Sequence, residues 1–250
     1  MIRLVRAEFL KLRTTQVWFW LLLGAVAVTT LLLVAQLAPH DGVNSDNDVY
    51  NVFTASGTAY VVVFVLGVLG VTTEYRYQTI TPTVLTTPSR WTLVTAKMIA
   101  YALLGAIYAL VCVIIQLAVA LPWLATKHIS VSLTKNHIPA ALLGVFLVVA
   151  LFGIVGLGIG ALLRNQIVAV SVGVIFLLVI QNVLVAIPGV KYAFPYLPGG
   201  AVGSIFTVVG SRDVNGATLL SPAGGVVVLL LWAFVPAILG AMFTLNRDIT

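Results

Sequence analysis

Charged side chains are scarce in this chain. They make up 8% of its 250 residues, against roughly 25% in an ordinary soluble domain. Hydrophobic residues make up 61%, and several apolar runs exceed the roughly 18 residues that indicate a transmembrane helix. We therefore predict an all-α polytopic membrane protein. Because no loop is long enough for an independent soluble domain, we expect residues 1–250 to form one transmembrane domain.

The sequence also lacks the residue patterns of several kinds of site. Cys112 is its only cysteine, which excludes an intrachain disulfide and a cysteine-based zinc site. The three histidines form neither an H-E-x-x-H motif nor a Ser-His arrangement within an apolar run, so we expect no metal site and no membrane protease. No Asp or Glu lies near the centre of an apolar run, which argues against a proton- or sodium-coupled carrier.

A phosphate-binding Walker A loop is absent as well. That loop, G-x-x-x-x-G-K-[ST], cradles phosphates and magnesium, but the sequence contains no Gly-Lys pair and no Lys followed by Ser or Thr. We therefore expect no catalytic residue and no cofactor on this chain, and we do not expect it to be an enzyme. If ATP drives the protein, hydrolysis occurs on a separate polypeptide.

Six apolar segments are long enough to cross a bilayer. The spans are predicted at about residues 17–38, 52–73, 94–121, 138–163, 167–187 and 223–245. Nine of the 13 lysines and arginines then lie on the side that holds both termini. Because basic residues near span ends resist translocation, this side is predicted to be cytoplasmic. The basic residues thus follow the membrane topology, and we expect no nucleic-acid partner.

Residues 1–14 are predicted to form an amphipathic helix before the first span. Its apolar stripe has spacings of three and four residues and comprises Ile2, Val5, Phe9 and Leu12. The basic residues that flank the stripe are Arg3, Arg6 and Arg13. Such a helix lies in the membrane interface, with its arginines at anionic headgroups; a simple positive-inside anchor is the alternative. Glu8 is spaced to pair with Lys11 one turn on.

A polar segment, residues 74–91 (EYRYQTITPTVLTTPSRW), separates the second and third spans. Pro82 ends any helix that begins at Tyr75, and Thr87 and Pro88 supply an N-cap followed by a proline at the first helical position. The segment can therefore form a short helix and a turn that present aromatic and aliphatic side chains. We predict a docking surface for a soluble partner; an ordinary loop with snorkelling arginines is the alternative.

In these segments the chain resembles the bacterial ABC-2 type transporter permeases. The resemblance is carried by the basic segment AEFLKLRTT, by the pattern E-Y-R-x-x-T-I-x-P-T-x-L-x-T-P-S-R-W followed by Lys97, and by six spans in about 250 residues. It covers the whole chain. Many relatives carry Gly at the position of Gln78, where a glycine permits a tighter turn.

The resemblance implies partners and a mechanism. Residues 74–91 would carry a coupling helix that sits on an ABC ATP-binding subunit, and the N-terminal helix would be the elbow helix that contacts the same subunit. ATP and Mg would be bound by that subunit. A second permease protomer would complete a homo- or heterodimer in the bacterial plasma membrane. Closure of the ATP-binding subunits would switch the permease pair between inward and outward access.

Within the coupling loop we assign three roles. The residues predicted to dock on the ATP-binding subunit are Glu74 and Arg76 for polar pairing, Tyr75, Ile80 and Leu85 for an apolar anchor, and Arg90 for fixing the loop to the third span.

The last outside segment, residues 188–222, has an apolar middle at 201–209 that is too short to span a bilayer. We predict a re-entrant or interfacial helix that caps the outer mouth of the pathway, because backbone at membrane depth must be buried in protein or face a water cavity. The permeases that the chain resembles have comparable re-entrant helices between their last two spans. A loop lying on the surface is the alternative.

Few polar residues lie within the spans, which suits a hydrophobic or amphiphilic substrate. The residues that could line its path are Tyr60, Phe64, Gln181 and Asn182, although interhelical packing and hydrogen bonding are the alternative for each. The glycines of residues 156–160 (GLGIG) predict close helix contact.

Two hypotheses for the function follow. The first is a permease subunit that exports a drug, lipid, peptide or antibiotic when bound to an ATPase. The second is a non-transporting membrane anchor, immunity or sensor component with the same fold.

Overall fold

The computed structural model describes residues 2–37, 46–78, 90–127, 129, 131–132, 136–187, 189–207, 213–214 and 217–245. Six segments are helical, long and apolar enough to cross a membrane: Val17–Leu37, Asp48–Arg76, Trp91–Thr126, Ile138–Leu163, Gln166–Ala186 and Pro222–Gly240. The prediction of an all-α protein with six candidate spans is thus confirmed.

The helices occur in the following order along the chain. The first half contains α1 (Ile2–Thr15), α2 (Val17–Leu37), α3 (Asp46–Thr54), the 3₁₀ segment η1 (Ala55–Ala59), α4 (Tyr60–Arg76) and α6 (Arg90–Thr126). The second half contains α7 (Ile138–Leu163), α8 (Gln166–Ile175), the π-helical η2 (Phe176–Ile180), α9 (Gln181–Ala186), the 3₁₀ segment η3 (Val190–Tyr196), α10 (Pro198–Phe206) and α11 (Pro222–Leu245). Strands β1 (Asp213–Val214) and β2 (Ala217–Thr218) pair antiparallel before α11.

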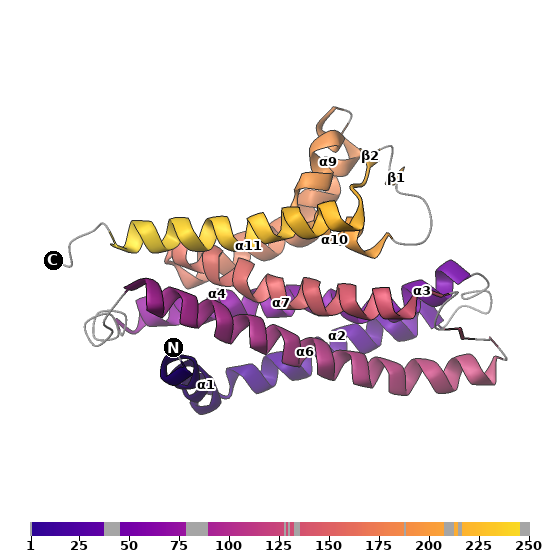
Figure 1. Ribbon diagram of the computed structural model, residues 1–250, viewed down its shortest axis with the longest axis horizontal. Coiled ribbons are helices and arrows are strands. Elements are labelled where there is room, and N and C mark those ends of the chain that lie inside the picture. Colours follow the sequence, from indigo (N-terminus) through magenta and orange to yellow (C-terminus); the bar gives the residue numbers. More distant parts are fainter. Residues whose placement is uncertain are drawn as a thin grey trace.

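Helix α7 is the centre of the bundle, where it packs against α4, α6 and α11 (Figure 1). Glycines allow these close approaches. A Cβ at Gly156 would collide with the carbonyl oxygen of Phe64 in α4, and one at Gly158 would lie 2.6 Å from the backbone nitrogen of Ala237 in α11. The close helix contact predicted for residues 156–160 is therefore confirmed, and it lies within one chain.

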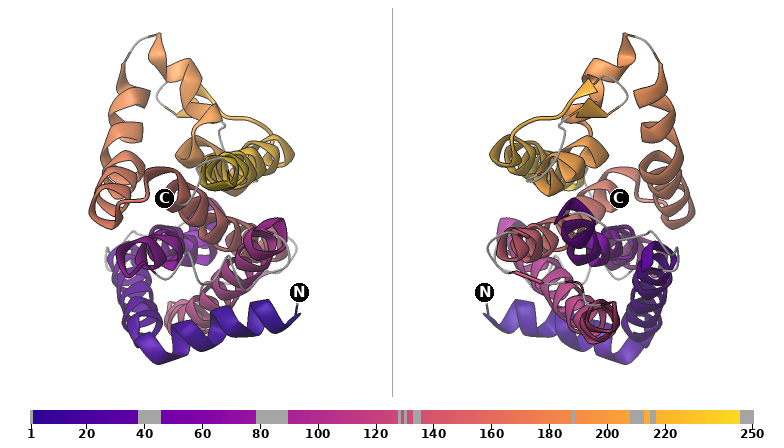
Figure 2. Two further views of the ribbon diagram at one scale, coloured as in Figure 1. Left: turned by 90° about the vertical axis from the view of Figure 1, so that its left-hand side faces the viewer. Right: turned by 90° about the vertical axis from the view of Figure 1, so that its right-hand side faces the viewer.

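Helix α1 lies across the end of the bundle, whereas α2, α4, α6, α7 and α11 run along it (Figures 1 and 2). It packs against α6 and α2. The left-handed backbone of Gln16, with φ 54°, separates it from α2. This turn places α1 beside the ends of α4 and α6, where the candidate site lies.

The second span is broken near one end. Its helix begins at Asp46, before residue 52 where the sequence predicted the span to start, and it passes through η1 before α4. The side chain of Gln116 in α6 accepts a hydrogen bond from the backbone N–H of Ser56 at 2.9 Å and donates one to the carbonyl of Val52. These two backbone groups are the pair that a continuous α-helix would join. The inserted amide therefore explains the break.

The segment before α11 contains the helix that the sequence predicted there. Helix α10 packs on α11. The side-chain oxygen of Gln181 accepts a hydrogen bond from the backbone N–H of Gly199 at its start. In addition, the indole of Trp232 donates to the carbonyl of Tyr196 at 2.9 Å. These contacts hold the segment against the bundle, and its re-entrant or interfacial placement stays a prediction.

Candidate functional site

Four charged side chains meet where α1 crosses the ends of α4 and α6. They form what we call the charge cluster: Glu8 and Lys11 of α1, Glu74 of α4 and Lys97 of α6. The Lys97 ammonium donates to Glu74 Oε1 at 2.6 Å and to Glu8 Oε2 at 3.0 Å. The Lys11 ammonium donates to the same Glu74 oxygen at 2.8 Å and to Glu8 Oε1 at 3.1 Å. Two carboxylates thus bind two ammonium groups across three helices.

Burial makes this pairing necessary. Glu8, Glu74 and Lys97 are 3%, 6% and 5% exposed. Removing a charge from water costs free energy that only an opposite charge and hydrogen bonds offset. Because the cluster contains two charges of each sign, its formal charge is zero. A lone buried member would be an uncompensated ion, so each of the three helices depends on the other two.

Lys11 occupies the open edge of the cluster, with 46% of its side chain exposed. Burial by itself lowers the pKa of this ammonium, but the hydrogen bonds and the negative charges of Glu74 and Glu8 outweigh burial, so that the pKa is raised above its ordinary value. Lys11 therefore stays protonated at physiological pH. Within the described part of the chain, Glu74 Oε2 has no hydrogen-bond partner, since both ammonium groups bind Oε1.

The local sequence positions these side chains. Glu8 and Lys11 lie one turn apart on α1, and the ion pair expected from their spacing is confirmed. Helix α4 ends at Arg76, two residues after Glu74, and Gln78 then adopts a left-handed φ of 55°. Glycine is favoured in this conformation, and here a glutamine adopts it.

The apolar stripe of α1 faces the bundle. Val5, Phe9 and Leu12 pack against the main hydrophobic core, whereas Ile2 is 86% exposed. The basic side chains that flank the stripe are all exposed: Arg3, Arg6 and Arg13. The predicted helix is confirmed. Protein therefore covers most of its stripe, and its position in a membrane interface stays a prediction.

A cavity of about 670 Å³ lies beside the charge cluster, between α1 and α4. Its polar rim includes Glu74, Arg76, Tyr77 and Gln166. The Arg76 guanidinium lies 3.5 Å from the side-chain oxygen of Gln166 and 5.7 Å from the ring centre of Tyr77. Both Arg76 and Tyr77 are exposed, so this rim is accessible to another molecule.

The structure separates the residues predicted to dock on a partner. Arg76 is exposed at the end of α4, and Tyr75 is partly buried with its ring 5.8 Å from the Arg164 guanidinium. Glu74 points into the chain and forms the ion pairs described above. Ile80 and Leu85 lie outside the described residues, and for Arg90 the description gives only its backbone at the start of α6. Docking by these residues stays a prediction.

Sequence reasoning missed that Lys97 binds both glutamates. One signal was available, because Glu8 and Glu74 are the only glutamates in the sequence and both lie close to apolar segments. Buried carboxylates require cationic partners. The few lysines and arginines on the same predicted side were therefore the candidates.

The residues proposed for a substrate path lie in different surroundings. Tyr60 lines a second cavity, near α10. Phe64 is buried in the core against the position of Gly173, and Gln181 is buried with Gly199 as its partner. Asn182 is exposed and donates to the carbonyl of Leu178 at 2.8 Å. The structure does not bring these four side chains together in one cavity, and their role in transport stays a prediction.

Comparison with known families gives one match. A family model described as ABC-2 family transporter protein matches residues 4–182. The matched region includes all four members of the charge cluster. No match was found among curated proteins.

Proposed function

The chain belongs to the ABC-2 family of transporter proteins, whose model covers well over half of its residues, and on this premise we propose that it is the permease subunit of an ATP-driven exporter. Six candidate spans agree with a membrane permease. Hydrolysis occurs on a separate ATP-binding subunit, which holds ATP and Mg, because this sequence contains no Walker A loop.

The observation that carries the proposal is the charge cluster. It joins α1 to the ends of two candidate spans, α4 and α6, which flank the predicted coupling loop in the sequence. A partner that displaces α1 or the end of α4 therefore moves a connected unit. Rigid-body motion of packed elements is a common route from an effector to a distant site.

In this proposal the two sets of residues have different tasks. The accessible Arg76, together with Tyr75, Ile80, Leu85 and Arg90, docks on the ATP-binding subunit. Glu74 contributes indirectly, because its carboxylate is occupied within the chain and holds α1 in place. The helix α1 is the elbow helix, and its exposed arginines, Arg3, Arg6 and Arg13, meet anionic headgroups.

The proposed assembly contains two permease protomers, as a homo- or heterodimer, in the bacterial plasma membrane with both termini inside. Its substrate is hydrophobic or amphiphilic, because the spans offer few ionisable groups. The competing function is a membrane anchor, immunity or sensor component that binds an ATPase without transporting.

The proposal is tested by affinity purification of the tagged chain from its native cells in mild detergent, followed by identification of co-purifying subunits and an ATP hydrolysis assay. We expect a stoichiometric ABC ATPase whose hydrolysis is stimulated by an exported amphiphile. A chain that purifies alone contradicts the proposal. A stable ATPase complex that no candidate substrate stimulates supports the anchor or sensor instead.

A further inference from the structure

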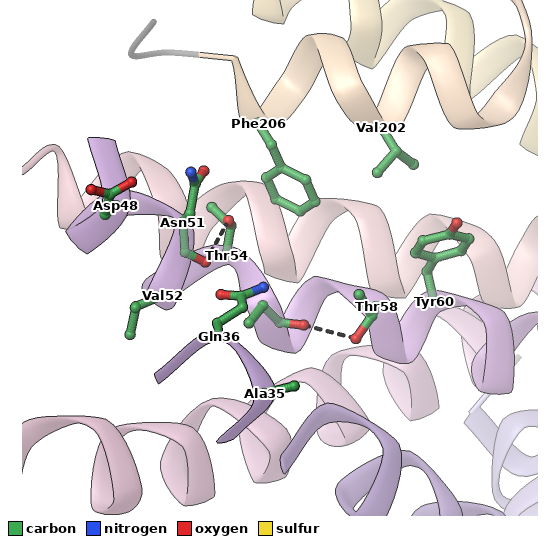
Figure 3. A pocket seen from close by; sticks show the side chains of 11 residues that line it. Ala35, Gln36, Asp48, Asn51, Val52, Thr54, Thr58, Tyr60, Val202 and Phe206 are labelled. Atoms are coloured by element: carbon green, nitrogen blue, oxygen red, sulfur yellow. Dashed lines mark hydrogen bonds between the residues drawn. The ribbon is translucent and has the colours of Figure 1, made fainter. Parts of the chain in front are cut away.

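A second cavity, of about 560 Å³, lies between α2, the broken second span and α10; we call it the α3–α10 pocket. Figure 3 shows Asp48 and Asn51 at one end, Tyr60 at the other, and Val202 and Phe206 of α10 above them. Its volume lies within the roughly 300–1,000 Å³ of small-molecule sites. Residues of five elements, α2, α3, η1, α4 and α10, thus line a space large enough for one small molecule.

The break in the second span forms one wall of this pocket. Gln116 interrupts the helix between Val52 and Ser56, and the residues around the break, Thr54 and Thr58, line the pocket. The ring of Phe206 reaches η1 at Gly57, where an added Cβ would lie 2.6 Å from the ring. Glycine at this position therefore allows α10 to close over the break.

The polar end of the pocket is rich in hydrogen-bond acceptors. The hydroxyl of Thr54 donates to the carbonyl of Asn51 at 3.1 Å, and that of Thr58 donates to the carbonyl of Ala55 at 2.8 Å (Figure 3). Since each hydroxyl has one proton, both present lone pairs to any further molecule. Asp48 adds a carboxylate, and no lysine or arginine occurs among the described residues that line the pocket.

The other end is apolar and aromatic. Tyr60 packs against Phe152, with ring centres 4.4 Å apart, so that its ring is held in place. Val202 covers this end from α10, and Phe206 lies further towards Asn51, above Thr54. Aromatic side chains offer a large apolar surface at a low cost in conformational entropy. An apolar body therefore fits between Tyr60 and Phe206.

We propose that the α3–α10 pocket binds one amphiphilic molecule. Its headgroup is uncharged or cationic and donates hydrogen bonds near Asp48, Thr54 and Thr58, while its apolar or aromatic body lies between Tyr60 and Phe206. As a step in export this binding rests on the proposed function, but binding itself requires neither the ATP-binding subunit nor nucleotide.

The test uses three dansyl probes with the same fluorophore and five-carbon chain, which end in an ammonium, a hydroxyl or a carboxylate group. Binding to the purified chain in lipid nanodiscs is followed by dansyl fluorescence, with empty nanodiscs subtracted. We expect saturable binding, with the ammonium and hydroxyl probes about tenfold tighter than the carboxylate. Equal affinity for all three probes, or no saturable binding, overturns the proposal.

Two variants locate the binding. Thr58→Val removes an acceptor oxygen without changing side-chain volume, and it should weaken the ammonium and hydroxyl probes about fivefold while leaving the carboxylate probe unchanged. Its matched control is Thr126→Val, because the Thr126 hydroxyl makes the same kind of local bond, to the carbonyl of Trp123 at 2.7 Å, and is exposed. Unchanged affinities in Thr58→Val overturn the assignment.

A second pair guards against loss of folding. Val202→Trp fills the pocket and should abolish saturable binding of all three probes, whereas Tyr192→Ala removes an exposed aromatic ring outside the pocket and should leave it intact. Both variants are checked by gel filtration and circular dichroism. Wild-type binding by a folded Val202→Trp protein contradicts the proposal.

The two proposals fail in different ways. Absence of probe binding in a preparation that still co-purifies an active ATPase overturns the pocket alone. Selective probe binding by a chain that purifies without any ATPase overturns the export function and leaves the pocket.

Discussion

The ammonium of Lys97 lies 2.6 Å from Oε1 of Glu74, although 23 residues separate the two along the chain. The same ammonium reaches Glu8, 89 residues away. A single lysine near the start of α6 therefore joins the end of α4 to a helix that lies across the bundle. The first predictions concern this relationship.

Replacing Lys97 with Met should destabilise the protein by about 3–5 kcal/mol, because it removes the buried ammonium that binds both carboxylates where water has little access. The measurement is thermal unfolding in detergent. Lys127→Met is the matched control, since Lys127 is exposed near the other end of α6. Equal unfolding temperatures for the two variants would show that the charge cluster does not stabilise the fold.

Replacing Lys11 with Met should cost much less, about 0–1 kcal/mol, because this lysine is half exposed and solvent screens its ion pairs. The same unfolding experiment measures it. A loss as large as that of Lys97→Met would contradict the dependence on burial.

Arg76→Ala should weaken co-purification of the ATP-binding subunit. It should change the free energy of unfolding by no more than about 0.5 kcal/mol, as expected of a surface substitution. Lys191→Ala is the control, because Lys191 lies on the opposite predicted side of the membrane. An unchanged yield of the complex in Arg76→Ala would remove this residue from the docking surface.

Gly156→Ala should destabilise the bundle by about 1–3 kcal/mol, because the added methyl group collides with the carbonyl oxygen of Phe64 in α4. Gly24→Ala in α2 is the control, since an added Cβ there meets no atom within 4 Å and alanine favours the helix. We expect Gly24→Ala to be neutral or slightly stabilising in the same unfolding assay. If the two variants have the same stability, the close approach of α7 and α4 does not require glycine at position 156.

Gln116→Leu should raise hydrogen exchange at the amide of Ser56 and lower stability by about 1–3 kcal/mol, because Ser56 N–H and the Val52 carbonyl lose their buried partner. Exchange is read by mass spectrometry of peptides covering η1. Unchanged protection at Ser56 would show that its N–H bonds directly to the Val52 carbonyl once the Gln116 amide is removed.

Properties that depend on neighbouring residues could be predicted from the sequence. The fourth span, predicted at residues 138–163 from its continuous apolar run, coincides with helix α7. The pair of Glu8 and Lys11 followed from helical spacing, and the close approach at Gly156 and Gly158 from the glycine pattern.

Contacts between residues far apart in the chain could not be predicted from the sequence. Nothing in the local pattern relates Lys97 to Glu8, or Gln116 to Ser56, because such contacts are set by how the helices pack. The helix of the second span also begins earlier than the predicted apolar stretch, residues 52–73. Asp46, Asn47 and Asp48 have the polarity of a loop, yet they begin α3, since a helix can extend beyond the apolar part of a span.

The five residues of η1 also determine how far α4 is shifted and rotated relative to α3. A 3₁₀ segment rises about 2.0 Å and turns about 120° per residue, whereas an α-helix rises about 1.5 Å and turns about 100°. Over five residues the difference amounts to about 2.5 Å of length and about 100° of rotation between α3 and α4. Asp48 and Asn51 therefore face the same pocket as Tyr60 only with this 3₁₀ segment in place. The side-chain amide of Gln116 maintains the rotation between α3 and α4, because it occupies the two backbone groups that would otherwise bond to each other.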